Sequence, residues 1–255
     1  MTGTLLVFEK LEEHRMAQLE ERFEVIRAWK ERNLESLLRN RGHEITGLIS
    51  SPLVTLREPL IKALPNLAVV STYSSGVTHI DVDALERRGI ALGNTPSVAS
   101  EDVADLAMGM TVALMRRLVE GDMAARFGKW SDSKQFLAPS LNGKTMGVFG
   151  MGAIGQALAR RGEAFGMNIL YSSRSVKNDL AYEYEPDILT LAERSDVLAL
   201  CCPGNSETAD IVGTDVLNAL GPKGYLVNVA RAAVVNRDDL ITALANRKIA
   251  GAALD

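Results

Sequence analysis

The stretch Gly150-Met151-Gly152-Ala153-Ile154-Gly155 fits the pattern G-x-G-x-x-G and decides the fold of the second half of the chain. It follows the apolar run Met146–Phe149 and opens the Ala- and Leu-bearing segment Ala153–Phe165, so we expect a strand, a tight turn and a helix. In such a unit the first glycine permits the turn, the second lets the backbone approach a pyrophosphate, and the third lets helix and strand pack closely. The free N–H groups at the start of the helix then face the phosphates. The sequence therefore predicts a dinucleotide-binding turn, and the alternative is a glycine turn that binds nothing.

The residues after the next predicted strand, Asn168–Tyr171, indicate which dinucleotide is bound. Such a strand usually ends in Asp or Glu, about 20 residues on, where the carboxylate bonds the ribose 2′-hydroxyl. This chain instead has Ser172-Ser173-Arg174, with Arg174 19 residues beyond Gly155. Ser173 could donate a hydrogen bond and Arg174 could pair with phosphate oxygens. The sequence therefore favours NADP (NADPH) over NAD; in the alternative, Arg174 is a solvated surface residue and NAD binds without its usual carboxylate.

Composition excludes several classes of protein. The 255 residues carry 28 Lys and Arg against 32 Asp and Glu, so no basic excess points to nucleic acid or an anionic membrane as the main partner. The only cysteines, Cys201 and Cys202, are adjacent, which excludes a disulfide framework and is too few for a structural zinc site. No basic-then-apolar secretory signal is visible, and the apolar stretch Leu106–Met115 is too short to span a bilayer. These features predict a cytoplasmic location and no metal.

Short β-rich runs alternate with amphipathic stretches, which is typical of an α/β fold with parallel sheets. Strands are expected at Thr4–Phe8, Phe23–Ile26, Ile45–Ile49, Leu67–Val70, Ile90–Leu92, Thr145–Phe149, Asn168–Tyr171, Asp196–Leu200, Tyr225–Val229 and Ala250–Leu254. Helices are expected at Leu11–Glu20, Leu34–Arg41 and Ala153–Phe165. A long helix, with Ser100 as its N-cap and Arg116 and Arg117 at its end, joins two domains. An irregular connecting loop follows over Phe127–Gly143.

Several motifs, in order along nearly the whole chain, resemble the D-isomer-specific 2-hydroxyacid dehydrogenases, and most closely the hydroxypyruvate/glyoxylate reductases. Besides the glycine turn they are Tyr73-Ser74-Ser75-Gly76-Val77-Thr78-His79-Ile80-Asp81, Gly89-Ile90-Ala91-Leu92-Gly93-Asn94-Thr95-Pro96, Ala104-Asp105-Leu106-Ala107, Cys202-Pro203 with Glu207-Thr208, Asn228-Val229-Ala230-Arg231 with Val234-Val235-Asn236, and Gly251-Ala252-Ala253-Leu254-Asp255. The set is far more specific than any one motif.

The resemblance implies two Rossmann-like domains with doubly wound parallel sheets and the active site in a cleft between them. A flavodoxin-like substrate domain would cover 1–96, and an NAD(P)-binding domain, C-terminally incomplete, would cover 97–255. The backbone N–H groups of Ser75 and Gly76 would cradle the substrate carboxylate. The cofactor would contact Gly150, Gly152, Ala153, Ile154, Gly155, Ser173, Arg174, Cys201, Pro203, Thr208, Val229 and Asp255. A homodimer through the helix over residues 100–117 is also implied, although its apolar face is equally what a buried core helix would show.

Reduction of a 2-oxo acid needs a fixed positive charge on the carbonyl oxygen, and Arg231 is the best candidate because its guanidinium stays charged and can hold carboxylate and carbonyl together. The alternative is an ordinary surface arginine after a strand. The family usually has Gly after this arginine, whereas this chain has Ala232, which would be strained if the backbone there needs φ > 0. Cys201 stands where many relatives carry His, and we expect it to be a small packed residue rather than a nucleophile. Leu53 and the loop around Phe136 are expected to form walls of the substrate pocket.

The family's proton donor is a His supported by a Glu, and both follow the position of Asp255, where this chain ends. Three readings stay open: a fragment of a longer enzyme, which we favour, a shortened protein that binds nucleotide without turnover, or a proton supplied by another group. His14 and His43 are expected to be solvated, and His79 to be a partly buried turn residue. The predicted function is hydride transfer from NAD(P)H to a small 2-oxo acid, giving a D-2-hydroxy acid. The alternative is a dinucleotide-binding, corepressor-like module without catalysis.

Overall fold

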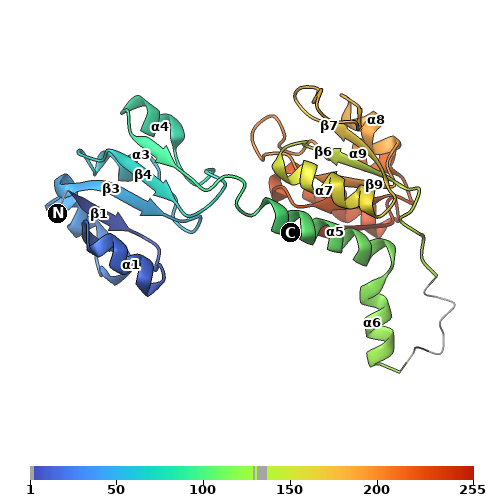
Figure 1. Cartoon of the computed structure of the whole chain (residues 1–255), viewed down its shortest axis with the longest axis horizontal. Coiled ribbons are helices and arrows are strands. Elements are labelled where there is room, and N and C mark those ends of the chain that lie inside the picture. The colour runs from blue at the N-terminus through green and yellow to red at the C-terminus, as the bar shows by residue number, and fades with distance from the viewer. Residues whose placement is uncertain (1–2, 129, 131–136) are drawn as a thin grey trace. The chain divides into compact units, whose positions relative to one another are not determined.

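The computed structural model describes residues 3–128, 130 and 137–255. The chain forms two compact units, residues 1–99 and 100–255 (Figure 1). The boundary between the units lies three residues after the end of the predicted substrate domain at residue 96. Each unit contains one parallel sheet, so the predicted α/β class is confirmed.

The first unit is a five-stranded parallel sheet in the order β2-β1-β3-β4-β5. Side chains alternate between its faces: Leu5 and Val7 pack with Met16 of the first helix, whereas Leu6 packs into a separate core on the other face. The elements are β1 (Thr4–Val7), α1 (Glu13–Glu20), β2 (Glu24–Arg27), α2 (Leu34–Arg41), β3 (Ile45–Ser50), α3 (Glu58–Lys62), β4 (Val69–Thr72), α4 (Val82–Arg87) and β5 (Ala91–Gly93).

The second unit is a six-stranded parallel sheet in the order β11-β10-β9-β6-β7-β8. Its elements are α5 (Ser100–Met115), α6 (Leu118–Arg126), β6 (Thr145–Phe149), α7 (Ala153–Ala164), β7 (Asn168–Ser172), β8 (Glu183–Tyr184), α8 (Ile188–Glu193), β9 (Val197–Leu200), α9 (Thr214–Leu220), β10 (Tyr225–Asn228), α10 (Arg237–Ala245) and β11 (Gly251–Leu254). Buried side chains of α5 and α7 form the core on one face, and those of α8, α9 and α10 form the core on the other.

The strand order reverses next to β6. The chain runs from β6 outward through β7 and β8, and then returns to place β9 on the other side of β6. In open α/β sheets, ligands bind in the crevice at the carboxyl ends of the strands where the order reverses. The fold therefore puts the turn that begins at Gly150 at the expected place for a ligand.

The long connecting helix is shorter than predicted. Ser100, expected as its N-cap, is the first residue of α5, and α5 ends at Met115. Arg117 adopts the left-handed conformation with φ of 53°, which stops the helix because such a residue cannot continue a right-handed turn. The chain then starts α6, which the sequence reading did not anticipate, and which extends away from the sheet (Figure 1).

None of the helices in the described residues combines the length and apolar character needed to cross a bilayer.

Candidate active site

The three glycines of the turn differ in what surrounds them. Gly150 has a φ of +107°, and a Cβ there would lie 2.5 Å from the backbone nitrogen of Cys202. A Cβ on Gly155 would lie 2.1 Å from the carbonyl oxygen of Gly150, so helix α7 could not approach the turn. A Cβ on Gly152 would meet nothing within 4 Å. The first and third glycines therefore make the turn and its packing possible, whereas Gly152 leaves open space beside the backbone.

That open space belongs to a cavity of about 530 Å³ at the carboxyl ends of β6, β7 and β9. Seven of the predicted cofactor contacts line it: Gly150, Gly152, Ser173, Arg174, Cys201, Pro203 and Thr208. Cys202 and Glu207, which belong to the family motif Cys202-Pro203 with Glu207-Thr208, also line it. The sequence did not indicate the other lining residues, namely Phe149, Met151, Ser172, Ser175, Lys177, Pro186, Asp187, Ile188, Asn205 and Ile211. Most of these residues follow the strands β7, β8 and β9. Their position just after a strand is the feature of the sequence that could have indicated them, once β8 is recognised. The open backbone at the glycine turn, together with the polar side chains of Ser173 and Arg174, fits a dinucleotide.

The remaining predicted contacts lie outside the cavity lining. Ala153 is the exposed first residue of α7, Ile154 packs against the core of the unit, and Gly155 is buried in the helix. Val229 is buried just after β10. Asp255 is exposed after β11, where its N–H donates to the carbonyl oxygen of Asn228 over 2.9 Å. Three of these five residues thus lie at the start of α7 and two directly after β10 and β11, and none of the five lines the cavity.

Ser173 and Arg174 follow β7, as predicted, and both face the cavity. The hydroxyl of Ser173 donates to the carbonyl oxygen of Ser175 over 2.7 Å, so its proton is engaged within the loop. Arg174 is exposed, and within the described part of the chain it forms no ion pair. Its guanidinium is therefore available to an anion.

The two adjacent cysteines are packed thiols rather than nucleophiles. Burial, followed by the neighbouring thiol of Cys202, raises the pKa of Cys201 to about 12. Burial likewise raises the pKa of Cys202 to about 11. Both groups therefore stay protonated near neutral pH, which agrees with the expectation for Cys201.

The loop after β10 holds Arg231. The buried amide of Asn228 bridges this loop: its nitrogen donates to the carbonyl oxygen of Arg231 over 3.0 Å, and its oxygen accepts from the N–H of Ala230 over 2.9 Å. A Cβ on Gly204 would lie 2.7 Å from Cγ of Arg231, so the stem of Arg231 packs directly on Gly204. Since Pro203 and Asn205 line the cavity, this contact puts Arg231 at its edge.

Ala232 does not have the positive φ that would strain an alanine at this position. It begins a short 3₁₀ helix, Ala232–Val234, and is absent from the residues with positive φ. The backbone after Arg231 therefore does not require glycine, and Ala232 fits there without strain.

In the first unit, Ser75 and Gly76 lie in the loop after β4. The carbonyl oxygen of Ser75 accepts from the side-chain amide of Asn94 over 2.8 Å, and that of Gly76 accepts from the Ser74 hydroxyl over 2.7 Å. Among the described residues, no acceptor receives a hydrogen bond from the N–H of Ser75 or Gly76. Two consecutive free N–H groups on an anchored loop suit a carboxylate.

His79 is tied into the same loop. Its Nε2 lies 3.1 Å from the hydroxyl of Thr72, and burial, followed by the charge of Arg57, lowers the pKa of the imidazole. A neutral, hydrogen-bonded imidazole agrees with the expected partly buried turn residue. The two expected pocket walls gain no support: Leu53 is 88% exposed, and Phe136 lies outside the described residues.

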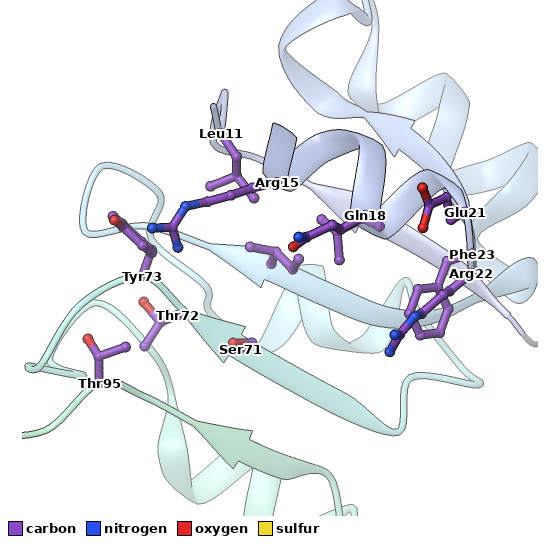
Figure 2. Close-up of a pocket in the computed structure, with 12 residues that line it drawn as sticks. Leu11, Arg15, Gln18, Glu21, Arg22, Phe23, Ser71, Thr72, Tyr73 and Thr95 are labelled. Carbon is purple, nitrogen blue, oxygen red and sulfur yellow. The ribbon is translucent and has the colours of Figure 1, made fainter. Parts of the chain in front are cut away.

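A second cavity of about 620 Å³ lies within the first unit between α1 and the strands β3 and β4 (Figure 2). The guanidinium of Arg15 lies over the ring of Tyr73, 6.0 Å from its centroid. None of the predicted site residues lines this cavity. In the part of the chain that the structure describes, no group of three His, Cys, Asp or Glu side chains could hold a metal ion.

Comparison with known proteins gives one consistent result. Residues 108–255 match the family model of the D-isomer specific 2-hydroxyacid dehydrogenase, NAD binding domain. The chain is 42% identical over 238 residues to glyoxylate/hydroxypyruvate reductase A of Arabidopsis thaliana, covering 93% of this chain and 76% of that protein. It is 38% identical over 218 residues to 2-ketogluconate reductase of Gluconobacter oxydans, covering 86% of this chain and 70% of that protein.

Solved structures agree. A 2-hydroxyacid dehydrogenase from Ketogulonicigenium vulgare matches with a TM-score of 0.90 and 34% identity, over 100% of this chain and 80% of that one. An NADPH-dependent glyoxylate/hydroxypyruvate reductase from Sinorhizobium meliloti, in complex with NADP and malonate, matches with a TM-score of 0.87 and 38% identity, over 100% of this chain and 79% of that one. The predicted fold and the predicted NAD(P)-dependent oxidoreductase are thereby confirmed. The chain belongs to the D-isomer-specific 2-hydroxyacid dehydrogenase family.

Proposed function

We propose that this protein transfers hydride from NADPH to a small 2-oxo acid of the glyoxylate or hydroxypyruvate type and forms the D-2-hydroxy acid. The observation that carries the proposal is the position of Arg231, whose stem packs on Gly204 at the edge of the dinucleotide cavity. The named activities of the Arabidopsis and Sinorhizobium relatives support this substrate class.

Arg231 has the chemistry that the reaction needs. Its guanidinium can pair with the substrate carboxylate and hold the carbonyl oxygen, where it stabilises the negative charge that develops during reduction. Asn228 fixes the loop that carries it through two hydrogen bonds. The free N–H groups of Ser75 and Gly76 are the proposed second contact for the carboxylate. His79 is not a candidate for the proton donor, because its Nε2 is engaged with the hydroxyl of Thr72 and burial lowers the pKa of its imidazole.

The bound nicotinamide supplies the hydride, and the residues of this chain fix its place. Gly150, Gly152 and Gly155 shape the turn, and the N–H groups at the start of α7, at Ala153 and Ile154, face the pyrophosphate. Cys201, Pro203, Thr208 and Val229 are proposed to contact the cofactor beside β9 and β10, and Asp255 to reach the nicotinamide amide. NADP is favoured over NAD because Arg174 is unpaired among the described residues and because Ser173 and Arg174, not a carboxylate, directly follow β7.

We also propose that the protein is a cytoplasmic homodimer. On the apolar face of α5, Met110 and Leu114 are partly buried against the core of the unit, whereas Leu106 is 45% exposed. The apolar surface of α6 supports association more strongly: Leu118, Val119 and Met123 are each more than half exposed. The adjacent, reduced cysteines are compatible with the cytoplasm.

The test is to incubate the protein with NADPH or NADH and glyoxylate, hydroxypyruvate or phenylpyruvate, and to analyse the product on a chiral column. We expect loss of NADPH with formation of glycolate and of D-glycerate, and slower loss of NADH. Binding of NADPH without consumption under any of these conditions, at high protein concentration, would support the binding-module alternative instead.

A further inference from the structure

The loop that follows β7 is fixed at both ends by tyrosine hydroxyls. Tyr184 donates a hydrogen bond to the carbonyl oxygen of Ser173 over 3.1 Å, at the start of the loop. Tyr171 accepts a hydrogen bond from the N–H of Lys177 over 2.8 Å, at its end. The two tyrosines are direct partners in the parallel pairing of β7 with β8, and their ring centroids are 5.3 Å apart. The two hydroxyls therefore hold the first and the last residue of the loop over residues 173–177.

The bracketed loop presents two cations to the dinucleotide cavity. Arg174 and Lys177 both line it, and within the described residues neither side chain forms an ion pair. The carboxylates that line the same cavity are Asp187 and Glu207. The carboxylate of Asp187 accepts hydrogen bonds from the N–H and the hydroxyl of Thr190, each over 2.8 Å, and is not paired with either cation. The loop thus offers two free positive charges on one short, anchored segment.

We propose that residues 173–177 form a preformed clamp for the cofactor's 2′-phosphate, with Lys177 as its second cation and with Tyr171 and Tyr184 as positioning residues. This inference rests on the proposed preference for NADPH. A flexible loop must be ordered when the phosphate binds, and that ordering weakens affinity. Two hydroxyl contacts, one at each end of the loop, remove that cost for the dinucleotide that carries the phosphate. They contribute nothing to the dinucleotide that lacks it.

The geometry also explains why the tyrosines, rather than nearby residues, have this role. Tyr182 lies two residues before Tyr184, but its hydroxyl donates to the carboxylate of Glu163 over 3.1 Å, away from the loop. Tyr182→Phe is therefore a matched control for Tyr184→Phe, and Lys248→Met, outside the cavity, is a matched control for Lys177→Met.

The test measures dissociation constants of NADPH and NADH from nicotinamide fluorescence for the full chain and for the variants. Lys177→Met is expected to weaken NADPH about tenfold, since it removes a charge-assisted contact. Tyr184→Phe and Tyr171→Phe are each expected to weaken NADPH about three- to fivefold, the effect of one hydrogen bond. NADH affinity should change less than about twofold in all three, and both controls should match the unmodified protein.

Equal weakening of both dinucleotides would show that the tyrosines only support the fold, and unchanged NADPH affinity in Lys177→Met would remove Lys177 from the clamp. Either result overturns the inference while leaving the cofactor preference intact. An unmodified protein that binds NADH as tightly as NADPH would instead overturn the preference itself, and the clamp with it. If Tyr171→Phe does not fold, because Tyr171 is 1% exposed, the partly exposed Tyr184 and Lys177 carry the test.

Discussion

Two glycines of the same turn are needed for different physical reasons. The backbone of Gly150 is in a conformation that L side chains rarely adopt, and an added Cβ would meet the backbone of Cys202 at 2.5 Å. Gly152 has an ordinary φ of −84° and faces open space. The glycine pattern in the sequence predicts both positions. It does not show which glycine the fold requires and which one faces open space, because that depends on contacts with Cys202, in the loop after β9.

The comparison of Gly150→Ala with Gly152→Ala tests this separation. Gly150→Ala is expected to lower the free energy of unfolding by about 2–4 kcal/mol, from strain at positive φ and overpacking. Gly152→Ala should leave stability within about 0.5 kcal/mol and weaken NADPH binding about tenfold or more. Urea unfolding and nicotinamide fluorescence measure the two effects. A destabilised Gly152→Ala with normal NADPH affinity would contradict the assignment.

Because its surroundings lower the pKa of His79, the free energy of unfolding is expected to fall as the pH falls. Burial and Arg57 lower the pKa of His79 in the folded state, so the unfolded chain takes up the proton first as the pH falls below about 6.5. The stabilisation is therefore complete above that pH and is lost as the pH falls toward the folded pKa. His79→Gln, which can keep a hydrogen bond to Thr72, should reduce the drop in urea midpoint between about pH 7 and pH 5. An unchanged drop would show that other groups cause it.

Among the elements, the loop after β10 carries the proposed catalytic residue, Arg231. Asn228 is buried at the end of β10, and its amide satisfies the N–H of Ala230 and the carbonyl oxygen of Arg231. The sequence motif predicts Arg231, whereas the role of Asn228 emerges only from these two contacts.

Replacing the amide should disturb Arg231 more than the cofactor. Asn228→Ala is expected to cost about 1–3 kcal/mol of stability, because it leaves buried polar groups without partners. It should also lower kcat with hydroxypyruvate about tenfold or more while changing the NADPH dissociation constant less than about threefold. Steady-state kinetics and fluorescence titration separate the two quantities. A loss confined to NADPH binding would place Asn228 with the cofactor instead.

The sequence predicted the elements with strong patterns and missed those that depend on context. The strands β1, β3, β6 and β7 lie where apolar runs predicted them, within about one residue. The two-residue strand β8 has no pattern of its own and exists because it pairs with Leu170 and Tyr171. Helix α6 was missed because its start depends on the left-handed conformation of Arg117, a residue type that favours helix. The cavity residues that follow β8, including Asp187, were missed with it.

At the scale of the whole molecule, helix α6 presents exposed apolar side chains to its surroundings. Ala124 is the one buried side chain of this helix, whereas Val119 and Met123 are 64% and 52% exposed. Apolar side chains gathered on a protruding helix mark an interaction surface. The proposed dimer would cover them.

A double substitution, Val119→Lys with Met123→Lys, should convert the dimer to a monomer and leave the thermal midpoint of unfolding nearly unchanged, because neither side chain is packed in the core. Light scattering after size exclusion measures the mass. Ile241→Lys, at a 54% exposed position on α10, is the control and should stay dimeric. A monomeric unmodified protein, or a double variant that remains dimeric, would contradict the placement of the interface on α6.

We propose that Arg231 promotes hydride transfer from bound NADPH to a 2-oxo acid, and a single-turnover experiment isolates this step. Protein in excess over NADPH is mixed with hydroxypyruvate, and the nicotinamide absorbance is followed for the unmodified protein and for Arg231→Gln. This design detects transfer even when proton donation is slow, since loss of a general acid slows the reaction only about 10²–10⁴-fold. We predict complete oxidation of NADPH by the unmodified protein and a rate at least about 10²-fold lower in Arg231→Gln, with NADPH affinity unchanged. Equal rates in the two proteins would rule out this role of Arg231, and no oxidation by a protein that binds NADPH would rule out the proposed reductase activity.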